Sequence, residues 1–186
     1  MLIKFAVKNF RGFSERIEWD LSNPSNYEFN TNAIKNGIIK NGIIFGPNGS
    51  GKTNFSVALF DIVYHLTQKA KKIDYYQNFV YGGNTNLIVD FEYTFKFGNQ
   101  LINYQYSKNA LGRLVKEFLT VNDVVIFKRD LNFLELDEKQ FPINADTKRN
   151  LQINANSISI VNYLLTSYPL AKDHYLLLLR DFVDSM

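Results

Sequence analysis

A glycine-rich segment near residue 50 constrains this chain more than any other part of its sequence. Residues 46–53 read Gly-Pro-Asn-Gly-Ser-Gly-Lys-Thr and satisfy the pattern G-x-x-x-x-G-K-[S/T]. A short apolar run at residues 42–45 precedes the segment, and apolar residues at three- and four-residue spacing follow it over residues 52–72. We interpret the run as a short buried strand and the later pattern as an amphipathic helix docked on a core. A strand, a glycine-rich loop and a helix in this order are typical of a phosphate-binding loop (P-loop).

The residue types in this loop suit phosphate binding. Glycine at positions 46, 49 and 51 lets the backbone turn, so that successive N–H groups and the helix N-terminus face one triphosphate. The Lys52 ammonium is expected on the β- and γ-phosphates, and the Thr53 hydroxyl is expected to ligate a Mg²⁺ that bridges them. The predicted nucleotide-binding residues of the loop are Gly46, Pro47, Asn48, Gly49, Ser50, Gly51, Lys52, Thr53 and Asn54.

Composition excludes several other classes of site. The 186 residues contain no cysteine, so a disulfide framework and a thiolate metal site are excluded, and two isolated histidines leave almost nothing for a zinc site. The formal net charge of +3 neither requires nor excludes a nucleic-acid partner. The N-terminus is charged from Lys4 onward, and no apolar run approaches the roughly 20 residues of a membrane span. We therefore expect a cytoplasmic protein that does not span a membrane.

The hydrophobic pattern predicts strands on both sides of the P-loop and helices at the end. Alternation of apolar and polar residues predicts an opening hairpin from strands at 2–9 and 16–21, followed by an irregular connector over 22–41. Strict alternation returns between residues 86 and 136, with turn signals such as Gly98-Asn99, and predicts an antiparallel meander of about five strands. Its aromatic residues are expected to be core rather than a base-stacking platform. Helical spacing follows at 158–165 and 172–183, interrupted at Tyr168-Pro169.

The opening segment and the P-loop together resemble a known family. Residues 2–13, which end Asn9-Phe10-Arg11-Gly12-Phe13, and the loop near residue 50 are similar to the N-terminal lobe of ABC/SMC-type ATPases. Within that group, the sequence most resembles the RecF-like and OLD-like proteins and the AAA-family ATPases of bacterial abortive-infection and other anti-phage defence systems. This resemblance implies an α/β P-loop NTPase fold with a mixed sheet, the antiparallel meander and C-terminal helices.

The resemblance also implies a function and partners. It implies ATP and Mg²⁺ as cofactors and places Arg11 near the bound nucleotide. In the complete protein two such subunits are expected to form a homodimer that sandwiches and hydrolyses two ATPs. Closure of that dimer is expected to drive an effector nuclease or an activity on DNA, in a defence or DNA-maintenance system.

Several parts of a hydrolytic site of this family are not identifiable in the sequence. There is no Leu-Ser-Gly-Gly signature and no apolar strand ending in Asp-Glu of the Walker B type. Residues 87–90, which end in Asp90, imitate a Walker B strand, but the alternation continues to residue 97 and favours a half-exposed antiparallel strand. Gln152 and the pair Asn156-Ser157 are the candidates for the Q-loop, which contacts Mg²⁺ and the attacking water in this family.

These observations leave three functional interpretations open. The favoured one is a single ATP-binding lobe over residues 1–186, built from 1–72, the meander at 86–136 and a helical extension at 151–186. Because the last helical pattern reaches residue 186 without a capping signal, the lobe is expected to belong to a longer protein. The alternatives are a nucleotide-binding regulatory module that does not hydrolyse ATP, and a compact P-loop kinase or GTPase that uses Asp90 on the metal.

Overall fold

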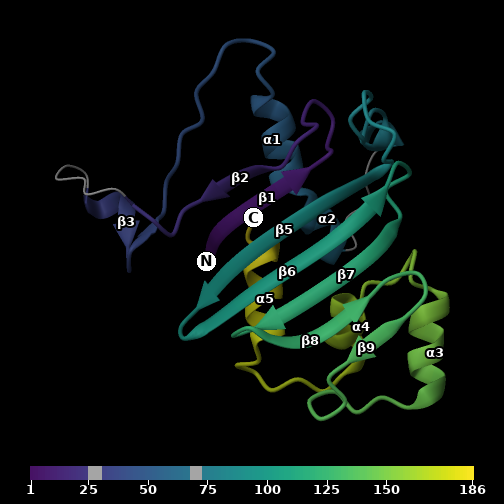
Figure 1. Cartoon of the computed structure of the whole chain (residues 1–186). Helices are drawn as coiled ribbons and strands as arrows, with labels where there is room; N and C mark the ends of the chain where they lie inside the picture. Colours follow the sequence, from purple (N-terminus) through teal and green to yellow (C-terminus); the bar gives the residue numbers. More distant parts are fainter. Residues whose placement is uncertain (25–30, 68–72) are drawn as a thin grey trace.

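Seven strands form one sheet in the order β2-β1-β5-β6-β7-β8-β9 (Figure 1). The computed structural model describes residues 1–24, 31–67 and 73–186. A two-stranded hairpin projects beside the sheet and places Ile38 against Ile3 and Leu21. The strands are β1 (Leu2–Lys8), β2 (Ile17–Asp20), β3 (Ile34–Lys35), β4 (Ile38–Ile39), β5 (Ile88–Phe97), β6 (Gln100–Asn109), β7 (Leu114–Val121), β8 (Val124–Arg129) and β9 (Leu134–Leu136).

The seven-stranded sheet is antiparallel throughout, and this corrects the expected fold class. Every pair of neighbouring strands, from β2 with β1 to β8 with β9, runs antiparallel. The expectation of an α/β P-loop NTPase fold with a mixed sheet is therefore wrong. A parallel pair needs a long crossover connection, whereas short turns join the consecutive strands from β5 to β9 and make each pair antiparallel.

The strands themselves follow the predicted pattern closely. The opening hairpin is present as β1 and β2, and the predicted five-stranded meander is present as β5 to β9. Gly98 turns the chain between β5 and β6 with a φ of 59°, and Asn122 and Asp123 adopt φ values of 49° and 64° between β7 and β8. Positive φ at both central residues is typical of the tight turns that join antiparallel strands. Local turn chemistry therefore explains these two tight turns, while shifts in register at Ser107/Lys108 and Leu119/Thr120 add irregularities within the strands.

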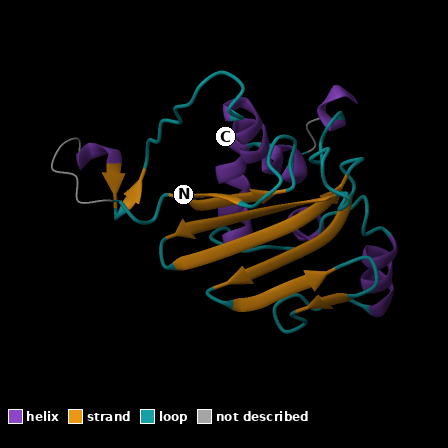
Figure 2. Cartoon of the chain, turned by 45° about the horizontal axis from the view of Figure 1, so that its top comes forward, coloured by secondary structure: helices purple, strands orange, loops and turns teal. Residues whose placement is uncertain are grey.

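Residues 42–45 do not form the predicted buried strand. They belong to no helix or strand, and the side chains of Ile43, Ile44 and Phe45 are 78%, 42% and 86% exposed. Figure 2 shows the chain between β4 and α1 (Lys52–Leu59) as an arch that stands away from the sheet. A parallel strand is stabilised by burial on both faces, and no described strand pairs with this segment.

Helices cover one face of the sheet. α1 and α2 (Asp61–Leu66) lie behind β1 and β5, and α5 (Tyr175–Asp184) contacts both α2 and β5 (Figure 1). The pattern over residues 52–72 predicted one helix, but the chain bends at Phe60, which ends α1 and precedes α2. Residues 68–72 of that prediction lie outside the described residues.

The C-terminal part contains one helix that the hydrophobic pattern did not indicate. The predicted helices at 158–165 and 172–183 are present as α4 (Ile160–Ser167) and α5, with Tyr168-Pro169 between them. The additional helix is α3 (Ala145–Ile153), capped by Asn144, whose side chain accepts a hydrogen bond from the Thr147 N–H at 2.7 Å. α3 buries only Leu151, so it lacks the apolar periodicity by which a helix is recognised.

Aromatic side chains fill the core between the sheet and the helices. Phe91, Tyr93 and Phe95 of β5 are each 1% exposed or less, and Tyr104 and Tyr106 of β6 are also buried beside them. Their burial confirms the prediction that the aromatic residues of the meander are core for β5 and β6, whereas Phe118 and Phe133 line a hollow on the other face of the sheet. The same core includes residues of the opening strands, of the meander and of the last helices.

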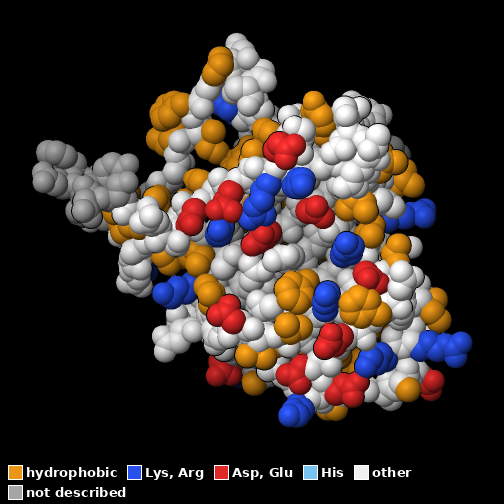
Figure 3. Space-filling view, in the orientation of Figure 1, with side chains coloured by type: hydrophobic (Ala, Val, Ile, Leu, Met, Phe, Trp, Pro, Cys, Tyr) orange, Lys and Arg blue, Asp and Glu red, His pale blue; other side chains and the backbone are white. Residues whose placement is uncertain are grey.

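The opposite face of the sheet is polar, and no described helix covers it (Figure 1). Successive side chains of a strand point to opposite faces, so Asp90 and Glu92 of β5 project away from the helices. Ion pairs cross this face, including Arg16 with Glu92 at 2.9 Å and Lys4 with Glu18 at 2.9 Å. Figure 3 shows Lys, Arg, Asp and Glu side chains intermixed on this face rather than gathered by sign.

Candidate nucleotide-binding site

The glycine-rich loop, predicted as a P-loop, directly follows no strand, because residues 42–45 form none, and it leads directly into α1, which begins at Lys52. Gly49 and Gly51 adopt φ values of 81° and 93°, in the left-handed region that residues with side chains rarely enter. A Cβ at Gly51 would also stand 2.9 Å from the ring of Phe13. Both backbone conformation and space therefore require glycine at position 51, where the loop becomes a helix.

The Lys52 side chain turns back into the loop. Its Nζ donates hydrogen bonds to the carbonyl oxygens of Gly46 at 2.6 Å and Pro47 at 2.7 Å. The first backbone N–H groups of α1, those of Thr53 and Asn54 included, have no acceptor within the helix, and the Thr53 side chain is exposed. One loop therefore presents an ammonium group, backbone donors and a hydroxyl, which are the groups that hold a phosphate and its metal ion.

An aromatic hollow of about 460 Å³ opens beside the loop. The backbone of the P-loop forms one wall, and Phe13, Trp19 and Phe55 contribute to the other. Trp19 packs edge-on against Phe55, with 5.6 Å between the ring centroids. Ligand sites are typically concave and mostly apolar, with a few polar groups that fix orientation. An apolar wall next to an ammonium group and backbone donors suits the nucleoside part of a nucleotide.

Arg11 lies in a turn that abuts the start of α1. A Cβ at the next residue, Gly12, would stand 3.4 Å from Asn54 Nδ2, and Arg11 and Asn54 line one hollow of about 440 Å³. The Arg11 guanidinium donates to the Tyr75 carbonyl oxygen at 3.1 Å and lies 5.6 Å from the centroid of the Tyr75 ring. Its buried Nε has no hydrogen-bond partner among the described residues. Arg11 is thus held beside the helix start by Tyr75.

A buried carboxylate connects Tyr75 to the sheet. Asp61, the first residue of α2, is fully buried and accepts hydrogen bonds from the Tyr75 hydroxyl at 2.9 Å and the Tyr106 hydroxyl at 2.8 Å. It also forms an ion pair with Lys108 of β6 at 2.5 Å. Burial, with a further contribution from the Asp61 carboxylate, raises the pKa of Tyr75 well above its ordinary value. Tyr75 therefore stays protonated and donates to Asp61 at neutral pH.

Asp90, the acid of the Walker B imitation, is remote from the P-loop. It is exposed on β5 and accepts a hydrogen bond from the Ser107 hydroxyl at 2.6 Å. The neighbouring Tyr93 instead donates to the carbonyl oxygen of Ala58 in α1 at 3.0 Å, so α1 lies behind the opposite face of the sheet. This separation disfavours the kinase or GTPase interpretation, which needs Asp90 on the metal.

The Q-loop candidates are also separated from the P-loop. Gln152 in α3 donates from Nε2 to the Asp130 carbonyl oxygen at 3.1 Å, and the Asn156 carbonyl accepts from the Leu114 N–H at 3.3 Å. Ser157 donates to the carbonyl oxygen of its neighbour Asn154 at 3.2 Å. α3 and α1 lie at opposite ends of the sheet in both cartoon views (Figures 1 and 2). The described structure therefore does not bring these residues to the loop.

Two buried ionic clusters were missed at the sequence level. Besides Asp61 with Lys108, Glu117 pairs with Arg129 at 2.7 Å and accepts from the N–H of Ile160 at 2.8 Å, at the start of α4. The sequence did contain a signal for these buried charges, because Lys108 and Glu117 occupy inward-facing positions in the alternating patterns of β6 and β7. A charge on the apolar side of a strand indicates a buried, paired group.

Other kinds of site are not evident in the described part of the chain. Residues 1–24, 31–67 and 73–186 contain no group of three or more His, Asp or Glu side chains placed to hold a metal ion. Their helices are all too short or too polar to cross a membrane. A comparison of the sequence with protein-family models and with curated proteins finds no match.

Proposed function

We propose that this chain binds ATP together with Mg²⁺ through the loop of residues 46–53. One observation carries the proposal. At the start of α1, Gly49 and Gly51 adopt left-handed backbone conformations, and the Lys52 ammonium turns back into the loop that they form. Lys52 would exchange its two carbonyl partners for phosphate oxygens, and Thr53 would ligate Mg²⁺ on the same phosphates. The proposal rests on this local geometry and not on the fold of the sheet.

The identity of the nucleotide and of the assembly rests on the resemblance to ABC/SMC-type ATPases. That resemblance favours ATP over other nucleotides and implies a homodimer with two nucleotides between the subunits. In such a dimer, closure would transmit the bound state to an effector nuclease or to DNA. The resemblance also implies that Arg11 contacts the bound nucleotide, and the hollow that Arg11 lines together with Asn54, the residue after Thr53, supports this role.

A second candidate is a regulatory module that holds ATP without hydrolysing it. Glu18 is an acidic residue in the wall of the aromatic hollow, but Lys4 and Arg16 bind its carboxylate at 2.9 Å and 2.8 Å. These pairs lower the pKa of Glu18 and occupy its oxygens. A carboxylate engaged in this way is poorly suited to act as a general base on water.

Thermal unfolding with and without Mg-ATP tests the proposal. At about 100 times the dissociation constant, Mg-ATP should raise the Tm of the wild-type chain by about 5–10 °C. Lys52→Ala should abolish this increase and leave the nucleotide-free Tm within a few degrees, because the side chain is half-buried and its ammonium donates hydrogen bonds to carbonyl oxygens of its own loop. Lys172→Ala, at an exposed position outside the loop, serves as the matched control. Undiminished stabilisation of Lys52→Ala by Mg-ATP would refute the assignment.

A further inference from the structure

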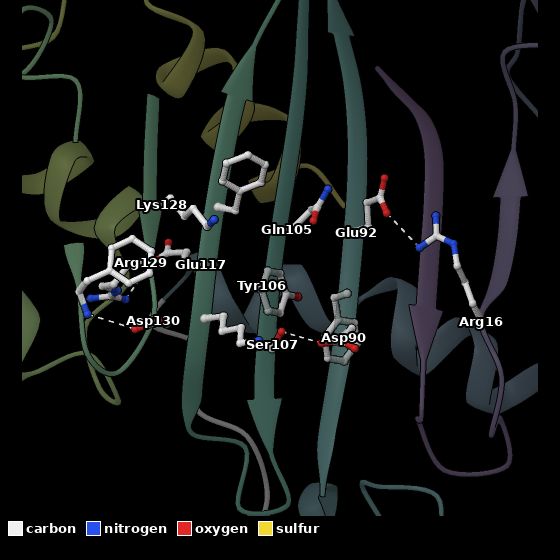
Figure 4. Close-up of a pocket in the computed structure, with 14 residues that line it drawn as sticks. Arg16, Asp90, Glu92, Gln105, Tyr106, Ser107, Glu117, Lys128, Arg129 and Asp130 are labelled. Carbon is white, nitrogen blue, oxygen red and sulfur yellow. Dashed lines mark hydrogen bonds and ion pairs between the residues drawn. The ribbon is translucent and has the colours of Figure 1, made fainter. Parts of the chain in front are cut away.

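A second hollow lies on the polar face of the sheet, opposite the face that α1 covers. It has a volume of about 600 Å³ and extends across β5, β6, β7 and β8 (Figure 4). Typical sites for small molecules enclose about 300–1,000 Å³. This hollow is therefore large enough for a small ligand and is separate from the P-loop.

The register of the strands arranges its side chains as a grid. Phe118 of β7 is directly opposite Gln105 of β6 on one side and Lys128 of β8 on the other. Lys116, two residues before Phe118 on the same face, is opposite Ser107. One aromatic ring is therefore surrounded by two ammonium groups and two neutral hydrogen-bonding groups.

Some charged residues that line the hollow form ion pairs, and others do not. Glu92 pairs with Arg16 at 2.9 Å, and the buried Glu117 pairs with Arg129 at 2.7 Å. Neither Lys116 nor Lys128 has an ion-pair partner among the described residues; Lys128 has only the ring of Phe133, with 5.8 Å from Nζ to the centroid. Asp90 and Asp130 of the same lining also have no ion-pair partner among the described residues, and Asp90 accepts a hydrogen bond from Ser107. The two ammonium groups without an ion pair both lie on β7 and β8, next to Phe118.

We propose that this hollow binds a small molecule in which an aromatic ring carries a phosphate group, of the size of a nucleoside monophosphate. The ring packs on Phe118, and Lys116 and Lys128 bind the phosphate. Gln105 donates from Nε2 to Asn103 and Ser107 donates its hydroxyl to Asp90, so the side-chain oxygens of Gln105 and Ser107 act as acceptors for N–H or O–H groups of the ligand. Two ammonium groups suit a doubly charged phosphate. The side chains of the lining on this face include three basic residues (Arg16, Lys116 and Lys128) and three acidic residues (Asp90, Glu92 and Asp130), and this overall neutrality favours a small anion over a polyanionic nucleic-acid strand.

Isothermal titration with 5′-AMP, adenosine and inorganic phosphate tests this site. The titrations use the wild-type chain and the Lys52→Ala variant, so that binding at the P-loop is recognised separately. We expect AMP to bind both proteins, at least about tenfold more tightly than adenosine or phosphate, because both halves of the ligand are held. Loss of AMP binding in Lys52→Ala would place the ligand at the P-loop and overturn this proposal while supporting the proposed function.

Variants of the lining residues separate the two halves of the interaction. The double variant Lys116→Gln, Lys128→Gln should weaken AMP binding at least about tenfold and leave adenosine binding unchanged. Phe118→Leu keeps an apolar side chain but removes the aromatic face, and it should weaken AMP and adenosine alike. Lys96→Gln, an exposed lysine on the same face of β5 but outside the hollow, is the matched control and should bind AMP normally.

Three results would contradict the inference. The first is that AMP binds no more tightly than inorganic phosphate, and the second is that the double lysine variant binds AMP as tightly as the wild type. The third is that an oligonucleotide such as dT12 binds far more tightly than AMP, with an affinity that depends steeply on salt. The last result would identify the face as a nucleic-acid surface, since counterion release makes such binding salt-dependent. Melting temperatures of the variants without ligand show whether each one is folded.

Discussion

Arg11 and Tyr75 show how single residues connect the candidate nucleotide site to the core. The guanidinium of Arg11 lies against the ring and the carbonyl oxygen of Tyr75. The hydroxyl of Tyr75 in turn donates to the buried Asp61, which pairs with Lys108 of the sheet. A buried carboxylate must keep its partners, because its desolvation is costly. Tyr75 is therefore held firmly and can orient Arg11.

A double-mutant cycle tests whether Tyr75 positions Arg11 for nucleotide binding. Tyr75→Ala removes the ring beside the guanidinium, and we expect a loss of ATP affinity of roughly 2- to 10-fold, the range of a cation–π contact. In the Arg11→Ala background the same substitution should have little further effect, since the residue that it orients is gone. ATP affinity of the four proteins is measured by titration calorimetry.

The conservative variant distinguishes positioning from simple support of the fold. Tyr75→Phe retains the ring and the carbonyl oxygen but loses the hydrogen bond to Asp61, so it should keep more of the ATP affinity than Tyr75→Ala. Fully additive losses in Tyr75→Ala and Arg11→Ala would show that the two residues act independently. Unfolding without nucleotide reports the purely structural cost of each change.

At the scale of elements, α5 begins with an unusual cap. The Nδ1 atom of His174 accepts a hydrogen bond from the N–H of Leu176 at 3.2 Å, and an imidazole nitrogen accepts only when it carries no proton. Burial lowers the pKa of His174 below its ordinary value, partly offset by Asp173. The first turn of α5, which packs on β5 and α2, is therefore stabilised by a neutral histidine.

This cap predicts a pH dependence of stability. Because the pKa of His174 is lower in the folded chain, the unfolded chain takes up the proton first as the pH falls. The stabilisation is present above the ordinary pKa of 6.5 and is lost as the pH falls through the lowered value. Since His174 is half-exposed, solvent screening limits the effect to no more than about 1 kcal/mol, or about 2–4 °C in Tm.

His174→Asn isolates the effect of the cap. Asparagine caps helices well and does not titrate, so the variant should lose less Tm than the wild type between about pH 7.5 and about pH 5. Thermal unfolding followed by circular dichroism at both pH values provides the comparison. Equal losses in the two proteins would show that other groups cause the acid sensitivity.

At the scale of the whole molecule, the arrangement of acids predicts slow turnover. Asp90 is on the far face of the sheet, and Glu18 is bound by Lys4 and Arg16. Contacts of the P-loop that are equal in the ground and transition states lower the dissociation constant without accelerating the chemical step. We therefore expect this chain to bind ATP and to release phosphate far more slowly than about 1 s⁻¹, the low end for competent enzymes.

Phosphate release by the purified chain with saturating Mg-ATP, at high protein concentration, measures this turnover. Lys52→Ala is the background control, because any release that survives in it comes from a contaminating enzyme. Turnover near or above about 1 s⁻¹ that disappears in Lys52→Ala would show that the chain contains a complete hydrolytic site.

Much of the fold could be predicted because it is encoded locally. The alternation in β5, the turn at Gly98 and the interruption at Pro169 depend on residues a few positions apart. The glycine-rich loop is partly of the same kind, since Gly49 and Gly51 adopt left-handed backbone conformations. The close approach of Phe13 to Gly51, however, is a tertiary contact. Even the buried Lys108 and Glu117 could have been identified from their inward positions in the alternation.

The sequence by itself therefore determined the strands of the main sheet, most of the helices and the positions of the glycines in the loop, whereas only the tertiary structure decided how distant segments meet. It placed Asp90 on the face opposite α1, left residues 42–45 outside any sheet and made every strand pair of the main sheet antiparallel. These outcomes depend on which segments bury apolar area against one another, with partners such as Asp61 and Lys108 separated by 47 positions. Local periodicity identifies which face of a segment is buried, but it does not identify the other segment against which that face packs.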